Sequence, residues 1–130
     1  MVADWRPGDT VDLAAELAIV APVRIISRLL GVDPSRDDWF LTMAADIAAL
    51  ADPTAGPDVM DRAEVQLGHF KDLLESAGSD GLYGELLGLQ EDGDRLSPTE
   101  TFSLVVALMT AGMETTASAM SLGALALMAH

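Results

Sequence analysis

The sequence contains no cysteine among its 130 residues and few positively charged side chains. Without cysteine the chain forms no disulfide and offers no thiolate to a metal, which fits a reducing compartment such as the cytoplasm. Seven Lys and Arg stand against 21 Asp and Glu, for a net charge of -14. Seven basic side chains can neutralise few phosphates. We therefore expect that the chain does not bind nucleic acid.

Sites for ions and phosphates are also missing from the sequence. His69 has no second His, Cys or paired carboxylates at metal-ligand spacing. The acidic turn at 91–94 lacks the ligand pattern of a calcium loop, and no glycine-rich loop cradles phosphate. We therefore expect no bound metal and no cofactor held by these residues.

Strand-like alternation and internal repeats are absent, whereas apolar residues recur at the three- to four-residue spacing of helices, as at Leu13 and Leu17. Gly31 is predicted to end one such helix, and the residues at 52–57 indicate a loop. The sequence predicts one all-α domain over residues 1–130, with about six helices around one long central helix.

The long helix is predicted over 97–130. Ser97 can cap its free amides, Pro98 suits the first helical position, and Glu100 completes a capping box. No proline follows, so the helix can continue for about 50 Å at about 1.5 Å per residue.

The apolar part of this helix, 102–129, exceeds the roughly 20 residues that a bilayer requires. Glu114 would then lie near mid-membrane, at a cost of about 2.5 to 3.5 kcal/mol. The many small and hydroxyl residues better suit a packed protein interior. We therefore expect a soluble, cytoplasmic chain with no membrane span.

Glu114 is the only charged residue after Glu100. It follows Gly112, which costs about 1 kcal/mol in a helix interior and can admit close approach of another backbone or a flat ligand. With the hydroxyls of Thr115 and Thr116 it is expected to form an acid–alcohol cluster that can relay protons. The alternative is that Glu114 lies on a solvated edge or bonds neighbouring hydroxyls.

The segment Ala-Gly-Met-Glu-Thr-Thr at 111–116 closely resembles the Ala-Gly-x-(Asp/Glu)-Thr-Thr segment in the long central helix of bacterial cytochrome P-450 monooxygenases. The stretch 22–32 resembles the family's Leu-Gly-Val helix, and 92–97 resembles the usual approach to the central helix. The chain as a whole is similar to a middle third of that family, a truncated cytochrome P-450-like fold.

The resemblance implies roles for four residues of this segment. Ala111 and Gly112 would lie over the haem, and Glu114 and Thr115 would help to deliver protons to bound oxygen. The chain departs from the family in lacking the cysteine that holds the haem. It also lacks the family's Glu-x-x-Arg helix, so the resemblance does not imply a haem bound by these residues.

Besides Ala111 and Gly112, three residues earlier in the chain are candidates for contact with a ligand. Trp39, Phe40 and Met43 lie on a helix predicted to start at Pro34, and in the family this helix covers the substrate pocket. The alternative for each of the three is core packing.

Three functions remain open at this point. The first is a haem-free protein of monooxygenase descent that binds an apolar small molecule, with Glu114 as acid or base in a cyclisation or isomerisation of natural-product biosynthesis. The second is a non-enzymatic auxiliary protein that supports a partner enzyme. The third is a fragment of an ordinary haem monooxygenase.

The long helix is apolar nearly all round, since Leu104, Val105 and Val106 lie on different sides of it. Its other large apolar residues are Leu108, Met109, Leu122, Leu125, Leu127 and Met128. Such a helix requires burial, and exposed apolar stripes invite association. We therefore expect a homo-oligomer, in its simplest form a twofold dimer.

Overall fold

The computed structural model describes residues 5–76, 81–91 and 94–129 and confirms an all-α fold. Within these ranges five α-helices and two short helices account for nearly all of the regular structure, and the sequence predicts about six helices. The only strands in these ranges form a two-residue antiparallel ladder. In chain order the elements are π-helix η2 (Ala14–Ala18), α1 (Val20–Leu29), 3-10 helix η3 (Pro34–Arg36), α2 (Asp37–Ala49), α3 (Pro57–Ser76), α4 (Gly81–Gly88), β1 (Gln90–Glu91), β2 (Asp94–Arg95) and α5 (Pro98–Ala129).

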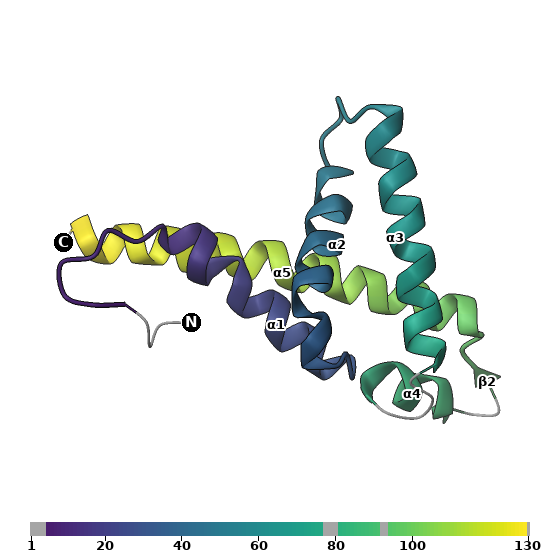
Figure 1. The fold of residues 1–130 in the computed structure, drawn as a ribbon. Coiled ribbons are helices and arrows are strands. Elements are labelled where there is room, and N and C mark those ends of the chain that lie inside the picture. The colour runs from purple at the N-terminus through teal and green to yellow at the C-terminus, as the bar shows by residue number, and fades with distance from the viewer. Residues whose placement is uncertain (1–4, 77–80, 92–93, 130) are drawn as a thin grey trace.

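The helices are arranged around α5, which runs the length of the molecule (Figure 1). Helices η2 and α1 pack alongside it, while α2 and α3 form an antiparallel pair that stands across it (Figure 1). Helix α4 lies beneath α3 and also contacts α5. The long helix is therefore central, as the sequence predicts.

The start of α5 carries the predicted capping box. The Glu100 carboxylate accepts hydrogen bonds from the Ser97 amide at 2.8 Å and the Ser97 hydroxyl at 2.7 Å. The Ser97 hydroxyl oxygen in turn accepts from the Glu100 amide at 3.3 Å. These bonds from Ser97 hold the pKa of Glu100 below its ordinary value. From this cap α5 runs without interruption for 32 residues.

We expect Ser97→Ala to cost about 1 kcal/mol of unfolding free energy, since it removes the cap at the hydroxyl. The pKa of Glu100 should rise toward its ordinary value. A carboxyl with a lowered pKa stabilises the fold above its unfolded pKa, and this stabilisation is lost as the pH falls through the folded pKa. The unfolding free energy of Ser97→Ala should therefore fall less steeply at acid pH than that of the parent chain. Urea unfolding at several pH values measures both effects. Ser103→Ala, an exposed serine inside the same helix, should leave the pH dependence unchanged and raise the stability slightly, because alanine is the better helix former.

Local signals also define the connection from α1 to α2. Gly31 has a φ of +80°, its amide donates to the Arg28 carbonyl at 3.0 Å, and the Val32 amide donates to the Ser27 carbonyl at 2.8 Å. This is a Schellman ending, which a glycine favours because it lacks a Cβ. Asp33 then accepts from the Ser35 amide and starts η3, which leads into α2.

An ion pair ties α1 to the first turn of α2. The Arg28 guanidinium donates to both carboxylate oxygens of Asp37, at 2.7 and 2.8 Å. Arg24 reaches the same carboxylate at 3.4 Å. The pair therefore links the last turn of α1 to the first turn of α2.

The core lies where α2, α3, α4 and α5 meet. Phe70 of α3 lies between Phe40 of α2 and Phe102 of α5, with ring centroids 5.7 and 6.0 Å away. Helix α5 contributes Val105, Met109 and Met113, which recur at the four-residue spacing of one helix face. The fully buried hydrophobic residues of the cluster are Phe40, Met43, Phe70, Val105 and Met109, with Leu74 and Tyr83 close to zero exposure.

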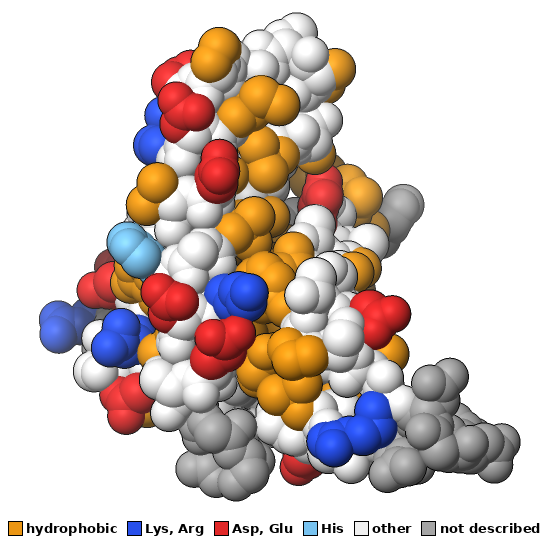
Figure 2. Space-filling model, turned by 90° about the vertical axis from the view of Figure 1, so that its right-hand side faces the viewer, with side chains coloured by type: hydrophobic (Ala, Val, Ile, Leu, Met, Phe, Trp, Pro, Cys, Tyr) orange, Lys and Arg blue, Asp and Glu red, His pale blue; other side chains and the backbone are white. Residues whose placement is uncertain are grey.

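The second half of α5 is far less covered than the first. No residue described after Met113 is fully buried, and the most exposed apolar side chains there are Leu127 and Met128, at 83% and 76%. Hydrophobic side chains also gather in a central strip, flanked by charges, on the face shown in Figure 2. By length and composition α5 is the one helix in the described ranges that could cross a bilayer, and 17% of its most apolar window is buried.

Candidate functional site

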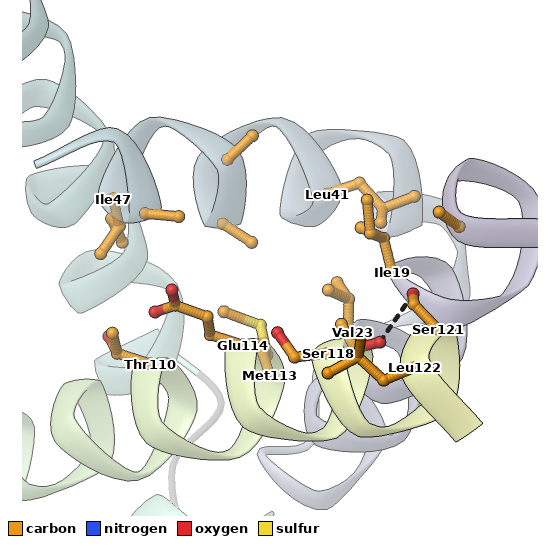
Figure 3. A pocket seen from close by; sticks show the side chains of 15 residues that line it. Ile19, Val23, Leu41, Ile47, Thr110, Met113, Glu114, Ser118, Ser121 and Leu122 are labelled. Carbon is orange, nitrogen blue, oxygen red and sulfur yellow. Dashed lines mark hydrogen bonds between the residues drawn. The ribbon is translucent and has the colours of Figure 1, made fainter. Parts of the chain in front are cut away.

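A groove of about 680 Å³ lies between α2 and α5 (Figure 3). One wall comes from α2 and the other from α5, and residues of η2 and α1 close one end. This volume is within the range of small-molecule sites. The lining residues are Ala14, Ile19, Val23, Leu41, Ala44, Ala45, Ile47, Ala48, Thr110, Met113, Glu114, Ala117, Ser118, Ser121 and Leu122.

Small residues on α2 keep the groove open. Ala44, Ala45 and Ala48 all face it, and their methyl groups fill little of the space between the two helices. Leu41 and Ile47 supply larger apolar surface toward the two ends of this wall. The α2 wall is therefore wholly apolar.

The α5 wall is mixed, and its polar groups follow one side of the helix. The Thr110 hydroxyl donates to the Val106 carbonyl, and the Ser121 hydroxyl to the Ala117 carbonyl, each at 2.9 Å. Glu114 lies between these two hydroxyls along the helix, and its side chain rises from α5 toward α2 (Figure 3).

Glu114 is solvent-exposed and lines the groove. It is the one charged residue among the lining residues. Within the described ranges, no hydrogen-bond donor or cation is paired with its carboxylate. The expected acid–alcohol cluster is not formed as a contact in the groove. The Thr115 hydroxyl donates to the Ala111 carbonyl at 2.7 Å, and Thr115 does not line the groove.

Ala111 and Gly112 also lie away from the groove wall. Ala111 is exposed, whereas Gly112 faces α1, where a Cβ would come within 3.1 Å of the Ile26 side chain. The glycine thus permits close packing of α1 on α5. The predicted contact of both residues with a ligand stays a prediction.

The three candidates on α2 take two positions. Phe40 and Met43 are fully buried in the core. Trp39 is half-buried, and its indole nitrogen donates to the Gln66 side chain of α3 at 2.9 Å. None of the three lines the groove, so their role in binding a ligand also stays a prediction.

Sequence reasoning did not single out Thr110, Ser118 or Ser121. The signal that could have found them is the spacing 110, 114 and 118, which places polar residues one turn apart on an otherwise apolar helix. No group of three or more His, Cys, Asp or Glu with metal-binding geometry is found in the part of the chain that the structure describes.

Comparisons with known proteins assign this architecture to a family, although no family model matches the chain. Cytochrome P450 CYP107DY1 of Priestia megaterium is 34% identical over 127 residues, covering 92% of this chain and 30% of that relative. Vitamin D(3) 25-hydroxylase of Pseudonocardia autotrophica is 38% identical over 125 residues, with the same two coverages.

A solved structure gives the same result for the fold. The ligand-free structure of cytochrome P450 TbtJ1 superposes with a TM-score of 0.74 and 27% identity, over 89% of this chain and 32% of that one. The chain thus spans about 30% of the length of the relatives it matches. It belongs to the cytochrome P450 family and corresponds to a partial segment of that fold that includes the long central helix.

Proposed function

We propose that this segment binds an apolar small molecule in the groove between α2 and α5, as the substrate-covering portion of a haem monooxygenase. The observation that carries the proposal is the groove itself, with its wholly apolar α2 wall. The names of the relatives support it, since one is a hydroxylase of vitamin D(3). The segment's own contribution is to exclude water from the ligand and to orient it along α5.

The residues present do not fit a haem–thiolate centre. The 130 residues include no cysteine, and His69 is exposed on α3, away from the groove. In an ordinary monooxygenase the thiolate would be supplied by residues other than these. We therefore derive no oxidative step from this segment.

A second candidate is acid–base chemistry without haem, such as a cyclisation or isomerisation in natural-product biosynthesis. It is favoured by one observation: the sole charged group lining the groove is a carboxylate, Glu114. A positioned acid or base contributes about 100- to 10,000-fold in rate. Thr115 would be its relay only after a change of side-chain position. Sequencing the reading frame beyond these residues separates the candidates, since a downstream cysteine motif supports the monooxygenase.

Binding in the groove can be tested with Nile red, a neutral apolar dye whose fluorescence rises on binding. Ala48→Trp fills the groove from its α2 wall and should weaken dye binding by at least about tenfold. The matched control is Ala119→Trp, which adds the same side chain at an exposed position of α5 outside the groove. Equal dye affinity in the two folded variants would contradict the proposal.

We further propose a cytoplasmic, homodimeric chain with no nucleic-acid or membrane partner. The exposed apolar side chains at the end of α5, Leu122, Leu125, Leu127 and Met128, support association through that helix. The 130-residue chain should therefore have the mass of a dimer in light scattering at micromolar concentration. A stable monomer would contradict the proposed dimer. The exposed apolar end of α5 would then be covered by a polypeptide segment other than a second copy of this chain.

A further inference from the structure

The polar groups of the groove favour ligands of one hydrogen-bonding type. Thr110 and Ser121 already donate their hydroxyl protons to backbone carbonyls of α5, so toward the groove they offer lone pairs. The Glu114 carboxylate accepts only, when ionised. Of the polar side chains on this wall, Ser118 alone retains a hydroxyl proton that the described residues do not engage.

The charge of the groove adds to its preference for hydrogen-bond donors. The lining includes one carboxylate and no Lys or Arg, and no cation of the described residues is paired with Glu114. The facing wall on α2 is apolar, so it supplies no counter-charge. A hydrogen bond to an ionised group is about twice as strong as one between neutral groups, so a cationic donor gains most.

The spacing of the acceptors sets the shape of the ligand. Residues 110, 114, 118 and 121 lie within one side of α5, since each step of four advances about 40° around the helix. From Thr110 to Ser121 the helix rises about 16 Å. A ligand along this stripe has its apolar flank against α2 and its donor near Glu114, about one turn from either neighbouring hydroxyl (Figure 3).

We infer that the groove selects elongated apolar small molecules that carry a protonated amine, with Glu114 as the residue that determines this specificity. The inference rests on the proposed function, because it requires that the groove binds a ligand. It adds the class of ligand and the group that recognises it. Glu114 acts here by binding and needs no proton transfer.

The test compares three probes of one chain length: decylammonium, decanol and decanoate. Titration calorimetry at pH 7 measures their affinities for the 130-residue chain. We expect decylammonium to bind about tenfold tighter than decanol, and decanoate to bind most weakly. Glu114→Gln should remove the preference for the ammonium over the alcohol while leaving decanol affinity unchanged. Glu114→Asp should retain part of the preference, since it keeps the charge.

The net charge of -14 attracts any cation, so a matched control is needed. Glu64→Gln removes the same charge from an exposed position of α3, outside the groove. It should retain the ammonium preference. An equal loss of preference in the two variants, or no preference in the parent chain, would overturn the inference.

The outcomes separate this inference from the proposed function. If all three probes bind equally well and Ala48→Trp weakens them all, the groove binds ligands and only the amine selectivity is wrong. If none of the probes binds the folded chain, the proposed function fails together with the inference. Circular dichroism of each variant confirms that the comparison is made between folded proteins.

Discussion

Replacing Phe40 by alanine should lower the unfolding free energy by about 3–5 kcal/mol. Phe40 is completely buried, and its ring meets Trp39 and Phe70 edge-on, with centroids 6.4 and 5.7 Å away. The substitution removes this ring from the junction of α2 and α3 and leaves a cavity. Since domains are stable by about 5–15 kcal/mol, a large part of the total would be lost.

Urea unfolding measures the effect, and the same samples separate two roles for Phe40. If Phe40 acts in the core, the folded fraction of Phe40→Ala should bind Nile red with the parent's affinity. Met60→Ala, an apolar residue 61% exposed on α3, should change stability by less than about 0.5 kcal/mol. If Phe40→Ala were as stable as the parent chain but no longer bound Nile red, Phe40 would instead be a ligand contact.

Gly81→Ala should destabilise the fold by about 2–4 kcal/mol. Gly81 begins α4 with a φ of +76°, a conformation that side chains other than glycine adopt at a cost. A Cβ there would lie 2.6 Å from the Leu30 carbonyl oxygen and 2.8 Å from the Gly31 amide nitrogen. Both contacts are backbone atoms at the end of α1, so α4 would have to move away from α1.

Gly88→Ala is the matched control, because it makes the same change at the other end of α4. A Cβ at Gly88 meets nothing within 4 Å. Alanine is the better helix former by about 1 kcal/mol, so this variant should be neutral or slightly more stable. Comparing the two thermal unfolding midpoints measures the effect. Equal midpoints would show that the close approach of α4 to α1 does not restrict residue 81.

The sequence predicted best those features that depend on a few neighbouring residues. The capping box at Ser97 and Glu100 and the glycine ending at Gly31 are local hydrogen-bond patterns, and both are present. The uninterrupted α5 followed from the absence of proline after Pro98. The family followed from the short segment around Gly112, because its residue types and order are specific.

The groove could not be predicted in this way, because it depends on how α2 crosses α5. Helix α2 packs on α1, α3 and α5, so its apolar residues contact three different helices and their spacing does not distinguish core from groove. The sequence therefore offered Phe40 and Met43 as candidate ligand contacts with core packing as the alternative, and it did not single out Ala44 and Ala48, which line the groove. Similarly, Glu114 and Thr115 are adjacent in sequence but about 100° apart around the helix.

The central claim is that ligands bind between α2 and α5, and methionine methyl groups test it most directly. Met113 lines the groove, Met43 is buried in the core, and Met128 is exposed near the end of α5. The chain is labelled with ¹³C at its methionine methyls and titrated with decanol. We predict that the Met113 resonance shifts with saturation, while the Met43 and Met128 resonances stay in place. A saturable shift of Met43 or Met128 without one of Met113 would contradict the claim.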